Sequence, residues 1–398
     1  MSYLVISLYF GILSLVENYI KIRSKILILF ILSIFFGFSY INGADWVFYQ
    51  QVYSRLPLFK SGFDIKLIEN NYNFENAYIW LCLIAKNLGI NFEFFRFLVM
   101  LFCINSLLKL VYKKTNERLI LLNLVFVKIM LVYYMEPILR QLIAISLFYY
   151  SFDYLYEKNY KKYLLIIFCI MLFHKSGILL LLLLLLLRNQ KIVGWKLVFI
   201  ILIGSLFLPP LLIETIKVIF YNITILNKYF VYTGREYINI NYSNTFYIVQ
   251  FFKNIIFFST FFILEKYQKL KDERILISKL ALISLVLGNM AITIGILNRF
   301  KLYFVIFHYI LLTYLLSIIL KPYKKIFIKF FINCYIIFTL LKSLILLDDK
   351  YPERYLPYTN YISLFIKNKL LTEEEKINLG LKRAKIYEMI DKREKNIN

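Results

Sequence analysis

A polar stretch, Tyr40 to Tyr53, interrupts a chain that is otherwise dominated by aliphatic and aromatic residues. Asp45, Tyr49 and Tyr53 recur every four residues, so on a helix they share one face, with Trp46 beside it. A carboxylate flanked by flat rings suits a sugar, whose C–H face packs on rings while its hydroxyls need an acceptor. Tyrosine and tryptophan also form the aromatic belt at any lipid boundary. The stretch therefore predicts a sugar site or an interfacial segment, and Asp45 favours the site.

Two arginines are candidates for binding phosphate. Arg140, followed by Gln141, opens an apolar segment, and Arg299 follows Asn298 at the end of another. The planar guanidinium group can bind two oxygens of a diphosphate at once. Arg140 can instead pair with Glu136, one helical turn earlier, and Arg299 can snorkel to the membrane surface.

His174 is one of two histidines in the chain and lies among apolar residues, with Ser176 two positions on. An imidazole can act as a general base near neutral pH. A lone histidine in a helix bundle is also often structural, and we interpret His308, which has no polar sequence neighbours, in that way. Asp45 and His174 are both candidate bases.

Composition predicts a protein embedded in a membrane. Hydrophobic residues make up 61% of the 398 residues, more than a water-soluble fold can bury. Runs of about 20 apolar residues, long enough for a hydrocarbon layer of about 30 Å, recur along the chain. They lie at 3–20, 25–40, 74–90, 94–111, 119–135, 137–156, 163–187, 192–211, 245–263, 275–296, 301–320 and 326–347. We expect an all-α, polytopic transmembrane helix bundle of about 10–12 segments, with 1–361 as one integral membrane domain and 362–398 as a polar charged tail.

The net charge of +24 reflects membrane orientation rather than binding to nucleic acid, because Lys and Arg cluster in short loops between apolar runs. Cytoplasmic placement of those loops leaves five stretches facing outward: 41–73, 136–140, 212–244, 297–300 and 348 onward. The candidate residues near Asp45, Arg140 and Arg299 then share the outer side. Lysines within apolar runs, at Lys128, Lys253 and Lys342, are expected to be functional or paired.

Counting the crossings needed between loops on assigned sides of the membrane predicts that two apolar segments do not span it. The run 77–89, between the outer stretch 41–73 and the next basic loop, is expected to be re-entrant or interfacial. The run 163–187 lies between two basic loops that are both assigned to the cytoplasm, so it must begin and end on the same side. A break at His174–Gly177 leaves two arms of about 11 residues, each about 16 Å long and half a membrane deep. Such a hairpin places His174 at a buried polar tip.

Motifs for common cofactors are missing from the sequence. It has no Walker loop, dinucleotide-binding glycine pattern, zinc motif or Ser-His-Asp order. Its four cysteines lie in apolar segments and are interpreted as packing residues. We therefore expect no metal and no cofactor, and a substrate that arrives through the membrane.

Five short elements, taken together, resemble the EpsG-like family of Wzy-type polysaccharide polymerases. They are Gly43-Ala-Asp45-Trp46 with Tyr49 and Tyr53, Arg140-Gln141-Leu-Ile-Ala144, Phe173-His174-Lys175-Ser176, Asn298-Arg299 with Tyr303, and Leu356-Pro357-Tyr358-Thr359-Asn360. The resemblance runs from about residue 25 to 361. The chain departs from the family pattern at Gly177, where alanine is frequent, and in its longer tail.

The resemblance implies a GT-C-like architecture and a membrane polymerase in the bacterial cytoplasmic (inner) membrane. Such an enzyme joins undecaprenyl-diphosphate-linked oligosaccharide repeat units into exopolysaccharide, capsule or O-antigen on the outer, extracytoplasmic face. Its partners would be that lipid-linked substrate, the lipid bilayer, a repeat-unit flippase and a chain-length regulator.

The resemblance also implies roles for single residues. The catalytic set would be Asp45, His174, Arg140 and Arg299. The substrate-binding set would be Trp46, Tyr49, Tyr53, Gln141, Ser176, Asn298, Tyr303 and Tyr358. Three alternatives remain open: a ligase or single-transfer glycosyltransferase, a polysaccharide flippase or transporter, and a membrane acyltransferase.

Overall fold

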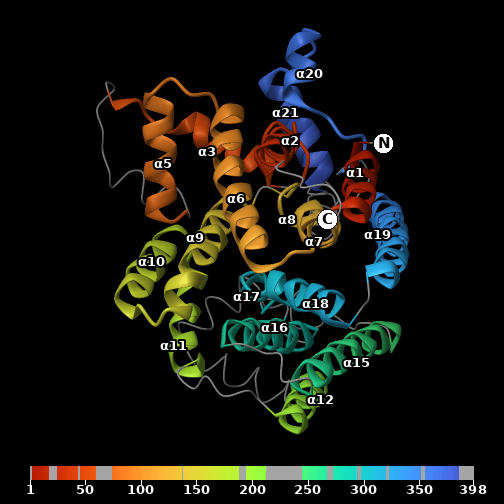
Figure 1. The fold of residues 1–398 in the computed structure, drawn as a ribbon. Helices are drawn as coiled ribbons and strands as arrows, with labels where there is room; N and C mark the ends of the chain where they lie inside the picture. The colour runs from red at the N-terminus through yellow and green to blue at the C-terminus, as the bar shows by residue number, and fades with distance from the viewer. Residues whose placement is uncertain are drawn as a thin grey trace, which may run out of the picture. The chain divides into compact units, whose positions relative to one another are not determined.

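The computed structural model of this chain is helical throughout the part that it describes (Figure 1). That part comprises residues 2–17, 25–43, 45–59, 74–136, 138–187, 194–211, 244–266, 272–292, 294, 297–319, 322–350 and 355–384. Within it, β structure is limited to an isolated bridge between Ser39 and Asn360. The predicted all-α class is confirmed.

The chain divides into two compact units. Unit 1 comprises Met1–Asp153, Tyr160–Gly177 and Lys321–Asn398, and unit 2 comprises Tyr154–Asn159 and Ile178–Leu320. The expectation that 1–361 forms one membrane domain stays a prediction.

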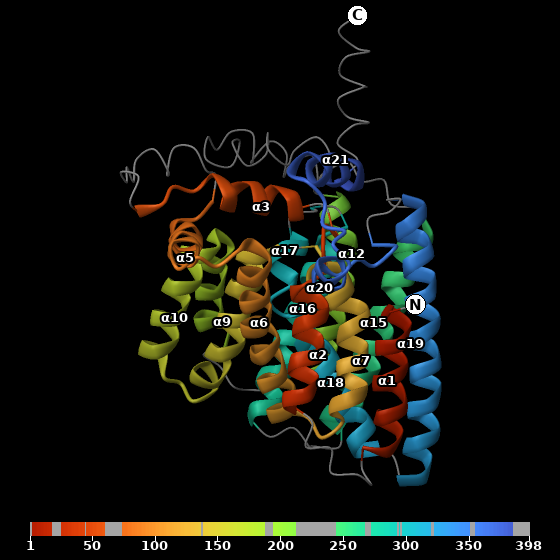
Figure 2. The ribbon, with the colours of Figure 1, turned by 90° about the horizontal axis from the view of Figure 1, so that it is seen from above.

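Unit 1 is made of helices, most of them apolar. Its elements are α1 (Ser2–Val16), α2 (Lys25–Gly37), α3 (Trp46–Arg55), α5 (Asn76–Asn87), α6 (Phe92–Lys114), α7 (Arg118–Val125), the π-helical turn η2 (Phe126–Met130), α8 (Leu131–Tyr133), most of α9 (Leu139–Tyr156), α10 (Tyr160–Phe173), α19 (Pro322–Lys350), α20 (Tyr361–Ile366) and α21 (Glu373–Ala384). Helix α1 packs against α7 and α19, and α2 packs against α6. Helices α3 and α21 lie together at one end of α2, α6 and α7 (Figure 2).

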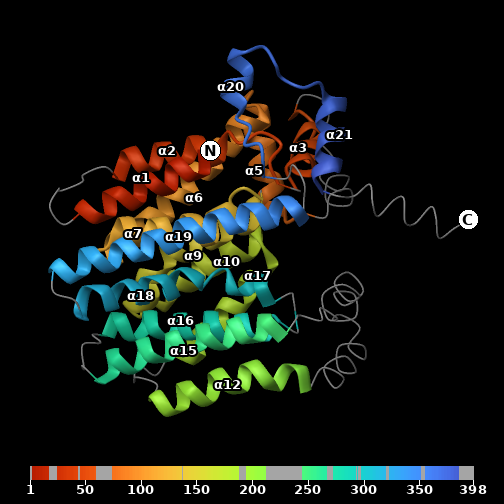
Figure 3. The same cartoon turned by 90° about the vertical axis from the view of Figure 1, so that its right-hand side faces the viewer.

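Unit 2 is a stack of apolar helices (Figure 3). It contains the 3-10 helix η3 (Lys175–Leu181) from Ile178 onward, α11 (Leu182–Leu187), α12 (Trp195–Leu211), α15 (Asn244–Lys266), α16 (Asp272–Met290), α17 (Leu297–Lys301) and α18 (Val305–Ile319). Helix α16 packs against α12, α17 and α18, so it forms the centre of the unit.

Every apolar segment expected from the sequence contains a helix. Two helical stretches, Phe92–Lys114 and Lys325–Ile345, are long and apolar enough to cross a membrane, and the further apolar stretches of the described part, such as Gln250–Ile263 within α15, have 10–17 residues. Helix α5 has 12 residues and spans only about 18 Å, too little for a crossing, as expected of an interfacial or re-entrant segment.

The predicted break in the run 163–187 is confirmed. Helix α10 ends at Phe173, His174 is non-helical, and the chain continues as η3 and α11. Because unit 2 begins at Ile178, the direction of the second arm stays a prediction.

Within unit 1, buried polar side chains join helices, and several large apolar side chains are exposed on the outside. Ser7 of α1 donates to Asn123 Oδ1 of α7 at 2.8 Å, and Asn123 Nδ2 donates to Asn333 Oδ1 of α19 at 2.9 Å, all three buried. Large side chains of the same helices, such as Ile12 and Phe338, are more than half exposed. Interhelical hydrogen bonds between small and polar residues are the usual means of joining helices in lipid.

An ion-pair cluster closes the other end of these helices. Glu117, in the loop before α7, pairs through Oε1 with Lys325 at 2.8 Å and through Oε2 with Lys329, both on α19. The side chains of Glu117 and Lys329 are each 1% exposed. Lys329 also donates to the carbonyl of Ser14 at 3.1 Å, so the cluster joins three helices.

Candidate active site

The loop that precedes α3, called here the Asp45 loop (residues 38–43 and Asp45), is held by the closing segment of unit 1. The Tyr40 amide donates to the Thr359 carbonyl at 2.9 Å, and the Tyr361 amide donates to the Phe38 carbonyl at 2.8 Å. The distant LPYTN element therefore pairs with the chain just ahead of Asp45.

The backbone of the Asp45 loop is left-handed at two positions, Ile41 with φ 54° and Gly43 with φ 87°. Glycine adopts this conformation without penalty, whereas a β-branched residue such as isoleucine is strained by about 1–3 kcal/mol. Strain of this kind persists only where the surrounding contacts determine the backbone, and it is concentrated at functional sites.

Three of the four aromatic side chains of α3, those of Trp46, Tyr49 and Tyr53, are buried, whereas Phe48 is exposed. Trp46 is fully buried between Tyr40 and Phe92, with ring centroids 5.3 Å away from each. Tyr53 is buried and donates its hydroxyl to the Ile90 carbonyl at 2.6 Å. Asp45 stands at the N-terminal end of α3 and is partly exposed.

A polar cluster, called here the Arg140 cluster, joins four elements of the unit. The Arg140 guanidinium pairs with Glu75, donates through Nε to the Tyr49 hydroxyl at 3.3 Å, and lies 4.0 Å from the centre of the Phe74 ring. The other Glu75 oxygen accepts the Lys175 amide at 3.2 Å. Glu75 thus connects the arginine of α9 to the segment that carries His174.

Burial raises the pKa of Tyr49 more than the nearby Arg140 charge lowers it. The Tyr49 hydroxyl therefore stays protonated, and its oxygen accepts the hydrogen bond from Arg140 Nε. Gln141, next to Arg140, is buried.

Glu75 is the functional candidate that sequence reasoning missed. It lies 65 positions from Arg140, and its only sequence signal is a carboxylate at the start of an apolar segment. Glu136, the sequence-predicted alternative partner of Arg140, accepts the Tyr355 hydroxyl at 2.6 Å.

The His174 turn fixes one nitrogen of the imidazole. The Ser176 amide donates to His174 Nδ1 at 3.3 Å, and the Ser176 hydroxyl is hydrogen-bonded to the same atom. Since an amide can only donate, Nδ1 is the acceptor, and the neutral ring carries its hydrogen on Nε2. His174 is therefore arranged as a hydrogen-bond donor through Nε2.

Gly177 completes this turn because a side chain does not fit there. Its amide donates to the His174 carbonyl at 2.9 Å, and an added Cβ would lie 2.5 Å from Ile170 Cγ2 of α10.

We expect Gly177→Ala to destabilise the protein by about 1–3 kcal/mol through overpacking. In thermal unfolding of the reconstituted protein, Ile170→Ala should offset part of that loss in the double variant. Strictly additive losses would contradict this account.

Tyr358 takes part in packing. Its ring stacks on Phe35 with centroids 4.4 Å apart, and its hydroxyl donates to the Phe35 carbonyl at 2.8 Å.

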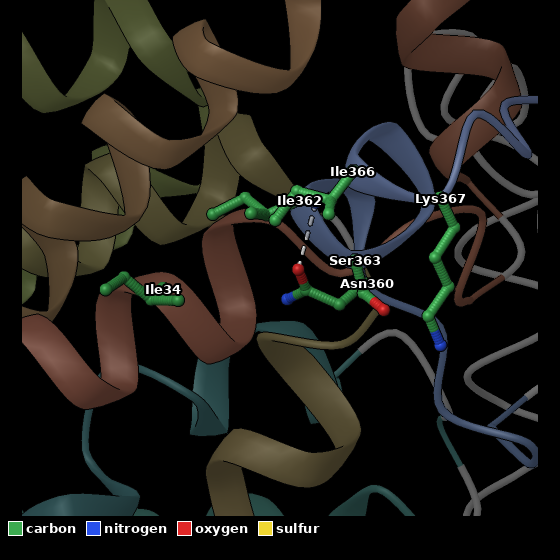
Figure 4. Close-up of a pocket in the computed structure, with 6 residues that line it drawn as sticks. All are labelled: Ile34, Asn360, Ile362, Ser363, Ile366 and Lys367. Carbon is green, nitrogen blue, oxygen red and sulfur yellow. Dashed lines mark hydrogen bonds between the residues drawn. The ribbon is translucent and has the colours of Figure 1, made fainter.

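A pocket of about 460 Å³ lies between α2 and α20 (Figure 4). It is lined by Ile34, Asn360, Ile362, Ser363, Ile366 and Lys367, none of which belongs to the Arg140 cluster.

The late arginine element belongs to unit 2. Asn298 and Arg299 are exposed on α17, and Tyr303 is buried just after it. Asp45, Arg140 and the His174 turn belong to unit 1. The prediction that Arg299 joins them in one pocket stays a prediction.

Unit 2 also contains two lysines, Lys253 and Lys301, whose charges act on His308. Lys253 of α15 lies one turn before Phe257, whose ring stacks on His308 with centroids 5.7 Å apart. The Lys301 side chain lies along Gly288, with Nζ 3.5 Å from the position of a built Cβ. The two lysine charges act on each other and on His308, so this histidine has the polar neighbourhood that its sequence does not show.

An all-helical bundle that contains two helices long and apolar enough to cross a membrane is typical of the class of integral membrane proteins. The EpsG family model matches residues 22–360, and the chain belongs to this family. Membership indicates a membrane protein of polysaccharide biosynthesis. No curated protein and no solved structure matches the chain.

Proposed function

We propose that this protein is a Wzy-type polymerase that joins undecaprenyl-diphosphate-linked repeat units at the outer face of the bacterial cytoplasmic membrane. The Arg140 cluster carries the proposal. It connects three of the family-like elements: Arg140 contacts Tyr49 directly, and Glu75 links Arg140 to Lys175. The substrate, a lipid-linked diphosphate sugar, needs a cation for its leaving group and a carboxylate for its acceptor.

In the proposed reaction, a hydroxyl of the incoming unit attacks the anomeric carbon of the growing glycan. The new C–O bond forms as the bond between that carbon and the diphosphate breaks, and the lipid diphosphate leaves with the bonding electron pair. Arg140 stabilises the charge that develops on the diphosphate. Its pairing with Glu75 holds the planar fork in one orientation.

Of the two candidate bases, we assign the role to Asp45. It is partly exposed at the start of α3, whereas the acceptor nitrogen of His174 is already engaged by Ser176. Asp45 takes the proton of the attacking hydroxyl. His174 donates from Nε2 to an oxygen of the substrate. A contribution of Arg299, which belongs to unit 2, stays a prediction.

Asp45→Asn and His174→Ala are each expected to abolish long polymer while single repeat units accumulate, because the first removes the base and the second a donor. Chain length is read from lipid-linked products of the purified, reconstituted protein. Glu157→Gln, an exposed carboxylate in a turn, is the matched control. A normal ladder from both site variants would refute the proposal, and a single added unit from the wild type would identify a ligase.

A further inference from the structure

Helix α21 lies beyond the family-matched residues 22–360 and packs against α3 (Figures 2 and 3). At Gly380 the two helices are so close that an added Cβ would collide with the side chain of Val47. At its start, Gln50 Nε2 donates to Glu373 Oε2 at 2.9 Å. Helix α21, which lies in the stretch expected from sequence to be a polar charged tail, therefore packs on the helix that follows Asp45.

The end of α21 places an arginine inside the Asp45 loop. Arg383 is 3% exposed, and its Nη1 donates to the Ile41 carbonyl at 2.5 Å and to Asn42 Oδ1 at 3.0 Å. A buried guanidinium is costly unless it is hydrogen-bonded. For Arg383, the hydrogen-bond acceptors that offset this cost are the Ile41 carbonyl and Asn42 Oδ1 of the Asp45 loop.

The same loop is held from its other side by Thr359. The Thr359 hydroxyl contacts the Tyr40 carbonyl at 2.5 Å and Asn42 Oδ1 at 3.2 Å. Asn42 Oδ1 is thus shared by Thr359 and Arg383. The left-handed Ile41 lies between these contacts, and they account for how its unfavourable backbone is maintained.

We propose that Arg383 is a positioning residue, and that α21 is a clamp that fixes the backbone leading to Asp45. The clamp rests on the proposed function for its effect on catalysis, but its effect on the loop is independent of it. A residue outside the family-matched part of the chain would then determine where the carboxylate of Asp45 stands.

Arg383→Gln tests the clamp in the full-length protein reconstituted in lipid nanodiscs. We expect a loss in kcat of about 10²-fold with KM little changed, because the substrate contacts remain and only the base is misplaced. Arg383→Lys, which keeps a buried donor, should restore part of kcat. Glu374→Gln on the exposed side of α21 is the matched control and should behave as wild type.

Hydrogen exchange separates the clamp from the polymerase proposal. In Arg383→Gln, the amides of residues 38–48 should exchange faster while those of α7 keep wild-type rates. Gly380→Ala, which lifts α21 from Val47 but keeps Arg383, should act in the same direction and replaces Arg383→Gln if that variant does not fold. Unchanged exchange in residues 38–48 overturns the clamp. If the wild type makes no polymer but residues 38–48 still exchange faster in the variants, the polymerase proposal is overturned and the clamp is supported.

Discussion

Arg140→Lys is expected to reduce the rate of polymer formation by about 10²–10³-fold, the usual effect of removing a donor aimed at developing charge. The guanidinium contacts Glu75, Tyr49 and the Phe74 ring together. An ammonium group is a compact point charge and cannot keep the planar contacts while it binds diphosphate. The initial rate of ladder formation measures the effect, and a rate above half that of wild type would contradict it.

Glu75 supplies the internal control for Arg140. Glu75→Gln keeps the shape of the side chain but removes the charge that orients the guanidinium, so polymer formation should also fall. If Glu75 acts through Arg140, the double variant Glu75→Gln, Arg140→Lys loses little more than Arg140→Lys alone. Fully multiplicative losses would show that the two residues act separately.

The second large effect concerns folding. Glu117→Gln should destabilise unit 1 by about 3–5 kcal/mol, the usual result of removing one partner from a buried ion pair. The variant leaves Lys329, 1% exposed, without its countercharge. Thermal unfolding in nanodiscs measures the loss. Glu373→Gln is the control, because Glu373 is 64% exposed in its pair with Lys376 and should cost no more than about 1 kcal/mol.

The same carboxylate predicts a pH dependence of stability. Burial alone would raise the pKa of Glu117, but the hydrogen bonds and charges of Lys325 and Lys329 outweigh burial and lower the pKa below its usual 4.5. The pair therefore contributes its full stability above pH 4.5, and that contribution is lost as the pH falls through the folded-state pKa. Wild type should lose stability there, and Glu117→Gln should lack that component. If the stability of wild type and that of Glu117→Gln changed with pH in the same way, this assignment would be refuted.

Most of the helical fold was predictable because lipid leaves the backbone few alternatives. Uninterrupted apolar runs must satisfy their amides internally, and each predicted run contains a helix. The polar interruption at His174–Gly177 predicted the end of α10 for the same reason. The η2 turn inside the run 119–135 has no hydrophobic signal, because a π-helical turn keeps the same apolar pattern.

The site was predictable only in part, because spacing along a helix does not show what the helix faces. The four-residue repeat placed Tyr49 and Tyr53 on one face, yet that face packs inward on Arg140 and Ile90. The role of Glu75 depends on two helix ends that meet in space. The docking of α21 depends on one glycine that fits against Val47, and a single glycine carries no periodic pattern.

Because α21 packs against α3, a label at the end of α21 reports the side of the membrane on which the Asp45 loop lies. A fusion partner attached after Ala384 shares its side of the bilayer with Asp45, because Arg383 reaches the carbonyl of Ile41 directly. An alkaline phosphatase fusion, active only after export, would then be active if glycan assembly occurs outside the cell. Bulky fusions at this position would also strain Arg383, so a long flexible spacer belongs in their design.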